Sequence, residues 1–415
     1  MACVRTAFWL AVLPTILLPT SKAGDWPQIL GPNRDGVAVG EQLLKSWPET
    51  GPETEWTAGV GDGFAGVAVK DNQVIVFHRT PSHEVVQALN AATGKEVWSS
   101  SFPCSYQSGM SSDSGPRCVP LIGDGQVFVL GVEGDLRCLD SATGKQVWHR
   151  DTSKDFSAPE GYFGVGSSPV FFKDRLIVNV GSRDNAAVVA FSTKNGETIW
   201  QAFQDTASYS APVIATINGA AHAIVVTRLH TVSFNPDDGA IRFQFPFGAR
   251  GPTVNGATPV VMGDHVFVSA SYRVGSAWAD VSSNKPEVKS LGEHFLATQY
   301  ATPVAYGDVL FAVDGRQDVG TASLKCISPA QQKTLWTKTG FDYGTLVRVN
   351  DELLFLTCGG ELIRIAADKT EYREVSRATV LPATPRGYRL PALSNGRLFV
   401  RGDRQLKCLR VGEGE

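Results

Sequence analysis

The chain has 415 residues, of which 43% are apolar and 19% charged, and it contains 42 Gly and 23 Pro. This composition excludes a disordered chain and favours many short strands joined by tight turns. The net charge of −3, with no cluster of Lys and Arg, excludes nucleic acid as a partner and a polybasic membrane-surface role.

Residues 1–23 have the pattern of a signal peptide. Arg5 precedes an apolar run over residues 7–18, and a small-Lys-small tripeptide over 21–23 stands before Gly24. The run is short for a bilayer span and is interrupted by Pro, so cleavage before Gly24 is favoured over an uncleaved anchor. Loss of the two basic residues would move the net charge from −3 to −5. We therefore expect an exported protein, periplasmic or secreted, with no transmembrane segment in the mature chain.

The cysteines fall into two groups. Cys138, Cys326 and Cys408 occupy one position in the related stretches LRCLD, LKCIS and LKCLR, which indicates small core residues on apolar strands. Cys104 and Cys118 flank one loop. In an exported protein they form a disulfide or stay free, and spacing alone leaves both alternatives open. The spacing of the cysteines matches neither a haem-attachment motif nor a zinc pair.

An eleven-residue stretch recurs along the chain and predicts a repeated unit. ALNAATGKEVW ends at Trp98, CLDSATGKQVW at Trp148 and AFSTKNGETIW at Trp200, and weaker copies end at Phe243 and Trp336. Upstream of each copy, two apolar stretches flank a turn, as in SSPVFFKDRLIVNVG. Each unit of about 40 to 50 residues therefore resolves into four antiparallel strands, which is typical of a β-propeller blade.

The markers predict an all-β, eight-bladed β-propeller. Seven units lie over residues 66–100, 115–150, 166–202, 210–246, 255–290, 300–338 and 342–377. The stretch over 390–411 supplies only three strands, and ETEWTAGV over 53–60 can add the fourth, because Trp56 matches the repeated Trp. Seven blades is the alternative, since two units are weakly marked, and a sandwich or several stacked domains is the competing architecture.

The expected organisation is a signal peptide over 1–23, a leader over 24–52, a propeller over 53–411 and a tail over 412–415. Closure of the last blade by strands from both ends would remove the open edge that invites aggregation.

The repeated letters have structural roles in this interpretation. A Trp on the outermost strand can cover the neighbouring blade, and its indole N–H can reach a carbonyl. The Gly of Thr-Gly-Lys supplies the turn conformation. The motif therefore predicts packing at five positions, Trp56, Trp98, Trp148, Trp200 and Trp336.

The pattern A-L-D-x-x-T-G-K-x-x-W resembles the tryptophan-docking repeat of pyrroloquinoline-quinone (PQQ) dehydrogenases and of the non-catalytic, BamB-like propellers of the outer-membrane barrel-assembly machinery. The stretches DWPQILGPNRDGVA and YSAPVIATINGAAHAIVV resemble exported PQQ-like repeat proteins. The resemblance covers nearly all of the mature chain, and it implies the propeller fold more than a chemistry.

A quinone dehydrogenase of this kind would need a calcium ion held by Glu, Asn and Asp oxygens and a carboxylate base. The adjacent Cys-Cys pair typical of these enzymes is absent, and no local sequence cluster has the character of a calcium site. The loop carboxylates that could serve are Asp113, Asp155, Asp314 and Asp342.

The loops that join strand d of one blade to strand a of the next form one mouth of a propeller and are the usual place for ligands. Here they are rich in Tyr, Ser and Gly. Tyr offers an amphipathic surface for a partner, and the alternative is that each Tyr caps its blade through backbone hydrogen bonds. The candidate binding residues are Tyr106, Arg117, Tyr162, Tyr209, Asn255, Tyr300, Tyr343 and Tyr388.

These observations favour a non-catalytic binding or scaffolding module of the cell envelope, with a protein or polysaccharide partner at this mouth and no cofactor. The first alternative is a dehydrogenase for small molecules that uses PQQ with calcium. The second is a hydrolase or lyase for extracellular polymers. Fold alone does not decide among them.

Overall fold

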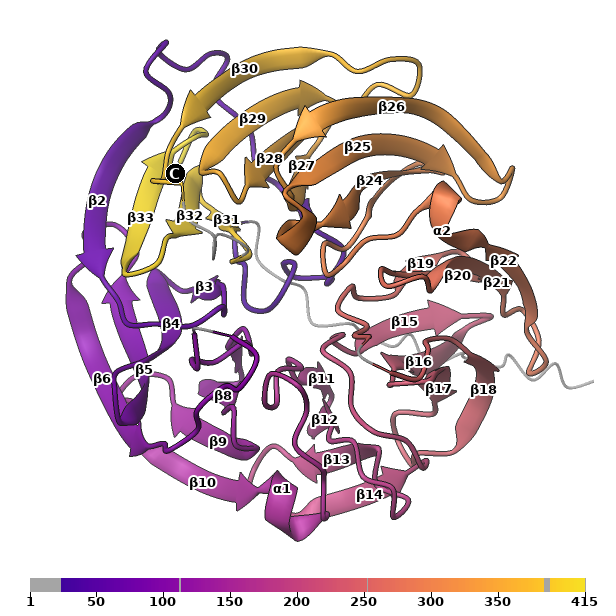
Figure 1. The fold of residues 1–415 in the computed structure, drawn as a ribbon. Helices are drawn as coiled ribbons and strands as arrows, with labels where there is room; N and C mark the ends of the chain where they lie inside the picture. Colours follow the sequence, from indigo (N-terminus) through magenta and orange to yellow (C-terminus); the bar gives the residue numbers. More distant parts are fainter. Residues whose placement is uncertain (1–23, 112, 252, 384–388, 415) are drawn as a thin grey trace, which may run out of the picture.

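The computed structural model describes residues 24–111, 113–251, 253–383 and 389–414. Eight antiparallel sheets stand around one axis, which confirms the all-β, eight-bladed β-propeller (Figure 1). The helices described are single turns: α1 (Thr152–Asp155), α2 (Gly292–Phe295) and the 3-10 helix η1 (Gln317–Val319). The signal peptide predicted over 1–23 lies outside the described residues.

The first four blades follow one another in chain order. Blade 1 consists of β3 (Val67–Lys70), β4 (Gln73–Arg79), β5 (His83–Asn90) and β6 (Glu96–Pro103). Blade 2 consists of β7 (Leu121–Gly123), β8 (Gln126–Leu130), β9 (Asp135–Asp140) and β10 (Gln146–Asp151). Blade 3 consists of β11 (Val170–Phe172), β12 (Arg175–Asn179), β13 (Val188–Ser192) and β14 (Thr198–Ala202). Blade 4 consists of β15 (Val213–Ile217), β16 (Ala220–Val226), β17 (His230–Phe234) and β18 (Ile241–Pro246).

The remaining blades complete the ring. Blade 5 consists of β19 (Val260–Met262), β20 (His265–Ala270), β21 (Gly275–Asp280) and β22 (Glu287–Leu291). Blade 6 consists of β23 (Val304–Tyr306), β24 (Val309–Arg316), β25 (Thr321–Ser328) and β26 (Lys333–Phe341). Blade 7 consists of β27 (Gly344–Val349), β28 (Glu352–Thr357), β29 (Glu361–Ala366) and β30 (Glu374–Thr379). Blade 8 consists of β31 (Ala392–Ser394), β32 (Arg397–Arg401), β33 (Gln405–Arg410) and, as its outer strand, β2 (Glu53–Gly59).

The hairpin turns give each blade two different ends. Because the strands alternate in direction, the a–b and c–d turns lie on one side of the ring, which we call the turn face, and the b–c and d–a loops lie on the other, which we call the loop face. The a–b turns are tight, and four of them have positive φ at both central residues, as at Asp124 and Gly125 (φ 51° and 72°) and at Asn395 and Gly396 (φ 50° and 71°). Asp-Gly and Asn-Gly pairs are the preferred residues for such turns. The other four have positive φ at the first central residue only, as at Lys173 (φ 55°).

The repeated Trp fastens each blade to the next. Its indole N–H donates to a carbonyl one or two residues after strand c of the following blade, at 2.8 to 3.1 Å, in five cases: Trp56 to Ala91, Trp98 to Ser141, Trp148 to Thr193, Trp200 to Pro236 and Trp336 to Asp368. In four of the five cases a Gly of the c–d turn in the following blade lies against the ring, and a Cβ at Gly144 would come within 2.4 Å of Trp98. The repeated motif therefore packs neighbouring blades against each other, as predicted.

The leader supplies the Trp that blade 7 lacks. Its outer strand β30 contains no Trp, but Trp47 donates from Nε1 to the carbonyl of Val411 at 3.3 Å, directly after β33. This carbonyl corresponds to the acceptors in the other blades. The guanidinium carbon of Arg364 lies 5.7 Å from the Trp47 ring.

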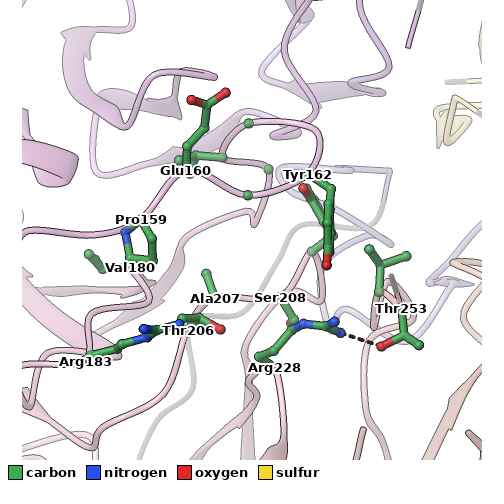
Figure 2. Close-up of a pocket in the computed structure, with 16 residues that line it drawn as sticks. Pro159, Glu160, Tyr162, Val180, Arg183, Thr206, Ala207, Ser208, Arg228 and Thr253 are labelled. Atoms are coloured by element: carbon green, nitrogen blue, oxygen red, sulfur yellow. Dashed lines mark hydrogen bonds between the residues drawn. The ribbon is translucent and has the colours of Figure 1, made fainter. Parts of the chain in front are cut away.

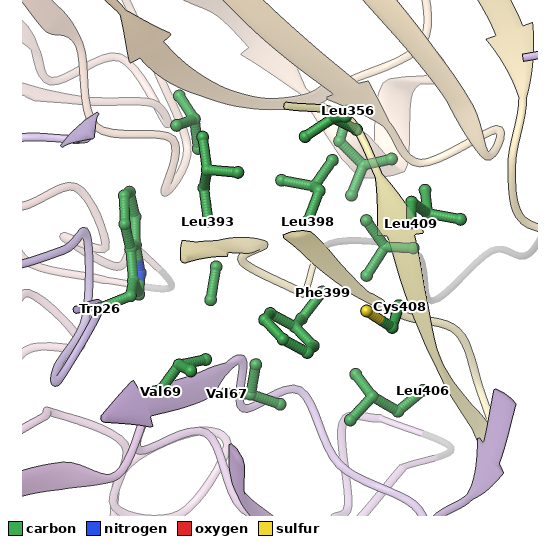
Figure 3. Packing of buried hydrophobic residues seen from close by; sticks show 14 of the residues in the cluster. Trp26, Val67, Val69, Leu356, Leu393, Leu398, Phe399, Leu406, Cys408 and Leu409 are labelled. Carbon is green, nitrogen blue, oxygen red and sulfur yellow. The ribbon is translucent and has the colours of Figure 1, made fainter. Parts of the chain in front are cut away.

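The leader also runs through the centre of the ring, where Figure 1 draws it in indigo. The backbone of Trp26 pairs with that of Val69 on the inner strand of blade 1, and Pro27 accepts from Ile122 of blade 2. Further along, β1 (Val37–Ala38) pairs in parallel with β27 of blade 7. The side chain of Trp26 completes the apolar cluster between blades 7, 8 and 1 (Figure 3).

Arg34 holds the middle of the leader in place. Its guanidinium is buried and donates to the carbonyls of Ser168, Pro169 and Pro212, which precede the inner strands of blades 3 and 4. Burial lowers the pKa of Arg34 to about 9. The leader thus links inner strands of blades on both sides of the ring.

The cysteines follow the predicted division in part. Cys138, Cys326 and Cys408 are buried on strand c, each opposite the Trp of strand d. Cys104 and Cys118 are free thiols, so the alternative of a disulfide between them is not realised in the structure. The two lie in different apolar clusters, and the Cys118 thiol accepts from the N–H of Leu130 at 3.3 Å.

Candidate functional site

The candidate binding residues that are described all lie in d–a segments of the loop face. Tyr106 and Arg117 lie between blades 1 and 2, Tyr162 between blades 2 and 3, Tyr209 between blades 3 and 4, Asn255 between blades 4 and 5, Tyr300 between blades 5 and 6, and Tyr343 between blades 6 and 7. Tyr388 lies outside the described residues. The remaining seven differ strongly in what they contact.

Tyr343 and Tyr300 are fixed by the protein itself. The buried Tyr343 hydroxyl accepts from the backbone N–H groups of Gln299, Tyr300 and Ala301 at 2.9 to 3.0 Å. Burial raises its pKa to about 12, so it stays protonated. The Tyr300 ring packs edge-on against that of Tyr343, with 4.7 Å between centroids. Tyr343 therefore has the backbone hydrogen bonds of the blade-capping alternative, whereas the Tyr300 hydroxyl donates to the side chain of Gln317 at 3.3 Å.

Tyr209 and Asn255 tie neighbouring blades together. The Tyr209 hydroxyl accepts from the N–H of Phe163 at 2.7 Å, and burial raises its pKa to about 12. The Asn255 carbonyl accepts from the N–H of Tyr209, and its side-chain amide donates to the carbonyl of Thr227 at 2.9 Å. Tyr106 is buried beside Val132. These contacts shape the loops that surround them.

Tyr162 and Arg117 are less enclosed. Tyr162 is 45% exposed, and its hydroxyl donates to the carbonyl of Gly251 at 3.1 Å. The guanidinium carbon of Arg117 lies between the rings of Phe64 and Phe163, 5.0 and 5.6 Å from their centroids. Of the predicted tyrosines that the structure describes, Tyr162 presents the most open ring to a partner.

A cavity of about 390 Å³ opens on the loop face where blades 3 and 4 meet (Figure 2). Its walls come from three d–a segments, over residues 159–166, 206–209 and 253–254, and from the b–c loops that carry Arg183 and Arg228. Its volume lies at the small end of the range for ligand sites, about 300 to 1,000 Å³. The sequence placed Tyr162 and Tyr209 on this face but did not show that they share one cavity.

Two arginines of this cavity were missed in the sequence. Arg228 donates from Nη1 to the Thr253 hydroxyl at 2.6 Å, and its guanidinium also bonds the carbonyl of Gly251. Arg183 is exposed in the b–c loop of blade 3. Both are single basic letters in b–c loops, TRLH and GSRDN, and no feature of these two loops signals that they belong together.

The carboxylates expected in loops have structural partners in three of four cases, and two of them lie outside loops, Asp314 on β24 and Asp155 in α1. Asp113 is buried and accepts from the N–H groups of Gly63 and Gly115 at 3.0 and 2.7 Å. Asp314 accepts from the N–H of Ala297 at 2.8 Å and pairs with Lys325 at 2.7 Å. Asp155 pairs with Arg150 at 2.7 Å, and Asp342 is exposed.

Metal ligands and membrane-spanning helices are both absent from the described ranges. Over residues 24–111, 113–251, 253–383 and 389–414, no three His, Cys, Asp or Glu side chains gather as metal ligands would. In the same part of the chain, no helix has the length and apolar character needed to cross a bilayer.

Residues 82–338 match the family model described as outer membrane protein assembly factor BamB. The chain belongs to this family of PQQ-like repeat β-propellers. A relative named outer membrane protein assembly factor BamB, from Burkholderia pseudomallei (strain K96243), is 23% identical over 63% of this chain and 77% of its own length. The quinohemoprotein alcohol dehydrogenase of Comamonas testosteroni is 28% identical over 33% of this chain, and the match spans only 20% of the enzyme.

Solved structures of both kinds share the fold. The crystal structure of quinohemoprotein alcohol dehydrogenase from Comamonas testosteroni aligns with a TM-score of 0.68 and 14% identity, over 95% of this chain and 82% of the enzyme chain. BamB from Moraxella catarrhalis aligns with a TM-score of 0.63 and 14% identity, over 86% of this chain and 99% of its own. At this level of identity the likeness concerns the propeller fold alone.

Proposed function

We propose that this protein is a non-catalytic binding or scaffolding propeller of the cell envelope, and that its loop face holds a protein partner. The observation that carries the proposal is that apolar side chains are exposed at the tips of loops on the loop face. Met110 and Val319 are 64% and 63% exposed, and Tyr162 is 45% exposed. Met110 and Tyr162 lie in d–a segments, and Val319 lies in the b–c loop of blade 6. Exposed aromatic residues and Met are enriched where proteins bind one another.

The turn face gives a useful contrast. Its c–d turns carry small or charged exposed residues, such as Ala92, Lys95 and Ala142. The other exposed aliphatic residues lie mainly on outer strands, where Val97 and Val147 each directly precede a docking Trp. We therefore place the apolar contacts of the proposed partner on the loop face and not on the turn face.

A PQQ and calcium centre, which the dehydrogenases of this family would imply, does not fit the described residues. Calcium needs six to eight oxygen ligands. The oxygens of Asp113 already accept two backbone N–H groups, and the Asp113 side chain lies 3.6 Å from Arg389 with both side chains fully buried. The carboxylate oxygens of Asp314 accept from the backbone N–H of Ala297 and pair with Lys325. We therefore propose binding rather than alcohol oxidation, and we derive no step through the quinone.

Site-specific cross-linking tests the proposal. A photoreactive phenylalanine analogue is placed at Met110, Tyr162 or Val319 in the full-length protein in cells, with Ala92 and Ala142 on the turn face as matched controls. We expect one protein adduct of constant mass from the loop-face positions and none from the controls. Adducts from both faces in equal yield, or from neither, would contradict the proposal.

The same protein can be tested for the alternative. Addition of PQQ and calcium chloride to the purified protein should change neither its absorption spectrum nor its melting temperature. A stoichiometric quinone spectrum with a raised melting temperature would instead support a dehydrogenase.

A further inference from the structure

We propose that the cavity between blades 3 and 4 binds a small hydroxylated carboxylate, with a hexuronic acid as the model ligand. This site shares Tyr162 with the loop-face tips of the proposed function, while Met110 and Val319 lie outside its lining, and it does not depend on a protein partner. The inference rests on the charge of the cavity, on its one aromatic wall and on the polar groups of its floor.

The charge of the cavity is positive. Arg183 and Arg228 line it, and Glu160 at the rim points away from both in Figure 2. Within the described residues, neither arginine has a carboxylate within 4.0 Å. Arg228 is held instead by neutral oxygens of Thr253 and Gly251, so its charge is not cancelled by its partners. A guanidinium held in this way is suited to a carboxylate, which it can bind through two parallel N–H bonds.

The aromatic wall is held rigidly. The guanidinium carbon of Arg228 lies 5.9 Å from the centroid of the Tyr162 ring, and the Tyr162 hydroxyl bonds the same Gly251 carbonyl as Arg228. Behind this wall the loop packs on Tyr209 through glycines, because a Cβ at Gly161 or Gly166 would come within 2.8 Å of the Tyr209 side chain. An exposed Tyr ring beside a charged group can cover the apolar face of a ligand whose other side is polar.

The floor of the cavity offers small polar groups in place of a deep apolar pocket. Thr206, Ser208 and Thr253 contribute hydroxyls, and the apolar lining residues are small, such as Ala207 and Val180 (Figure 2). The Ser208 and Thr253 hydroxyls already donate to the carbonyls of Val226 and Ala249, so they can only accept from a ligand hydroxyl, whereas Thr206 can both donate and accept. The arginines can bind a carboxylate of the ligand, Tyr162 can cover an apolar ring face, and the floor can bond several hydroxyls. A sugar acid carries all three kinds of group.

Isothermal titration calorimetry on the full-length mature protein tests this site with four probes. They are D-galacturonate, the neutral D-galactose, a trigalacturonate and the acidic peptide Ac-Asp-Gly-Asp-NH2. The variants are Arg183→Met, Arg228→Met and Tyr162→Ala. Arg250→Met is the matched control, because Arg250 is exposed in the same d–a segment as Thr253 but does not line the cavity.

We expect galacturonate to bind at least roughly tenfold more tightly than galactose, since a hydrogen bond to a charged group contributes that much. Arg183→Met and Arg228→Met should each weaken galacturonate roughly tenfold, and Arg250→Met should not. Because the Arg228 guanidinium also holds the d–a segment at Gly251 and Thr253, the exposed Arg183 and Tyr162 keep the test valid if Arg228→Met fails to fold. Tighter binding of the trimer than of the monomer would identify a polysaccharide end as the source, and equal binding a free sugar acid.

Three results would overturn the proposal. These are equal binding of galactose and galacturonate, binding of galacturonate that survives both arginine changes, and binding of the acidic peptide as tight as that of galacturonate with the same dependence on Arg183. The last result would make the cavity a site for acidic protein segments instead of sugar acids.

Discussion

Replacing Glu84 with Gln should change how the stability of the protein depends on pH. Glu84 lies on β5 with 4% exposure, and it accepts from the N–H of Val132 in the next blade at 2.9 Å. Burial raises its pKa to about 7, with Asp135 and Glu133 adding to the rise and Arg79 opposing it. In the unfolded chain the same carboxyl titrates near its ordinary value of 4.5.

The sign follows from which state holds the proton. Between pH 4.5 and 7 the folded protein keeps a proton on Glu84 that the unfolded chain has released, so stability is lost as the pH rises through this window. The difference between 7 and 4.5 corresponds to about 3 kcal/mol in the free energy of unfolding. A Gln side chain keeps the acceptor for Val132 and has no proton to lose.

Guanidinium unfolding of the wild type and Glu84→Gln, measured at half-unit steps from pH 4.5 to 8.5, tests this. The amide of the variant does not titrate, so the variant should gain stability over the wild type steadily up to pH 7 and no further above it. Groups common to both proteins cancel in the difference. Parallel pH profiles would show that Glu84 does not titrate in this window, and the reasoning from its burial would then be wrong.

Three further predictions concern the packing and one buried histidine. Trp47→Ala should lower the free energy of unfolding by about 3 to 5 kcal/mol, as replacement of a core aromatic does, although Trp47 lies in the leader. A loss below about 1 kcal/mol in denaturant unfolding would refute the docking role of Trp47. Gly144→Ala should lower the melting temperature more than Gly125→Ala, since both have positive φ (71° and 72°) but only a Cβ at Gly144 meets Trp98; equal losses would count against the contact. Burial lowers the pKa of His78 to about 4, so the wild type should lose stability relative to His78→Gln as the pH falls below 6.5, and NMR titration of the imidazole near pH 6.5 would contradict this.

The blades could be predicted from the sequence because each blade packs against the next through the same residue types at equivalent positions. Trp148 contacts a carbonyl and a Gly of the next blade, and the residues that make these contacts recur in the sequence with the period of the blades. Even the eighth blade could be predicted, because Trp56 marked its outer strand far from the rest of it. The period also explains why Phe243 could replace Trp on β18 while the blade kept its register.

The path of the leader and the cavity could not be predicted in this way. Arg34 bonds carbonyls of blades 3 and 4, and such partners leave no pattern in the sequence because any residue supplies a carbonyl. Trp47 lacks the Thr-Gly-Lys that precedes Trp98 and Trp148. The cavity joins Arg183, Arg228 and Tyr162 from three separate loops, and loop residues carry no period that would align them. Spacing alone could not decide whether Cys104 and Cys118 pair, because it carries no information on the direction of their side chains; both are free thiols in the structure.

The closure of blade 8 has a consequence for the order of folding. Glu53 pairs with Arg410 and Val37 with Arg348, so the earliest strands of the chain have partners that are synthesised last. Contacts of such long sequence separation form slowly, and until then the unpaired strands are exposed to other chains. A chain that emerges N-terminus first must therefore hold β1 and β2 without their strand partners while blades 1 to 6 take shape. The ring can close only after β33 has been synthesised, because β33 is the strand with which β2 pairs.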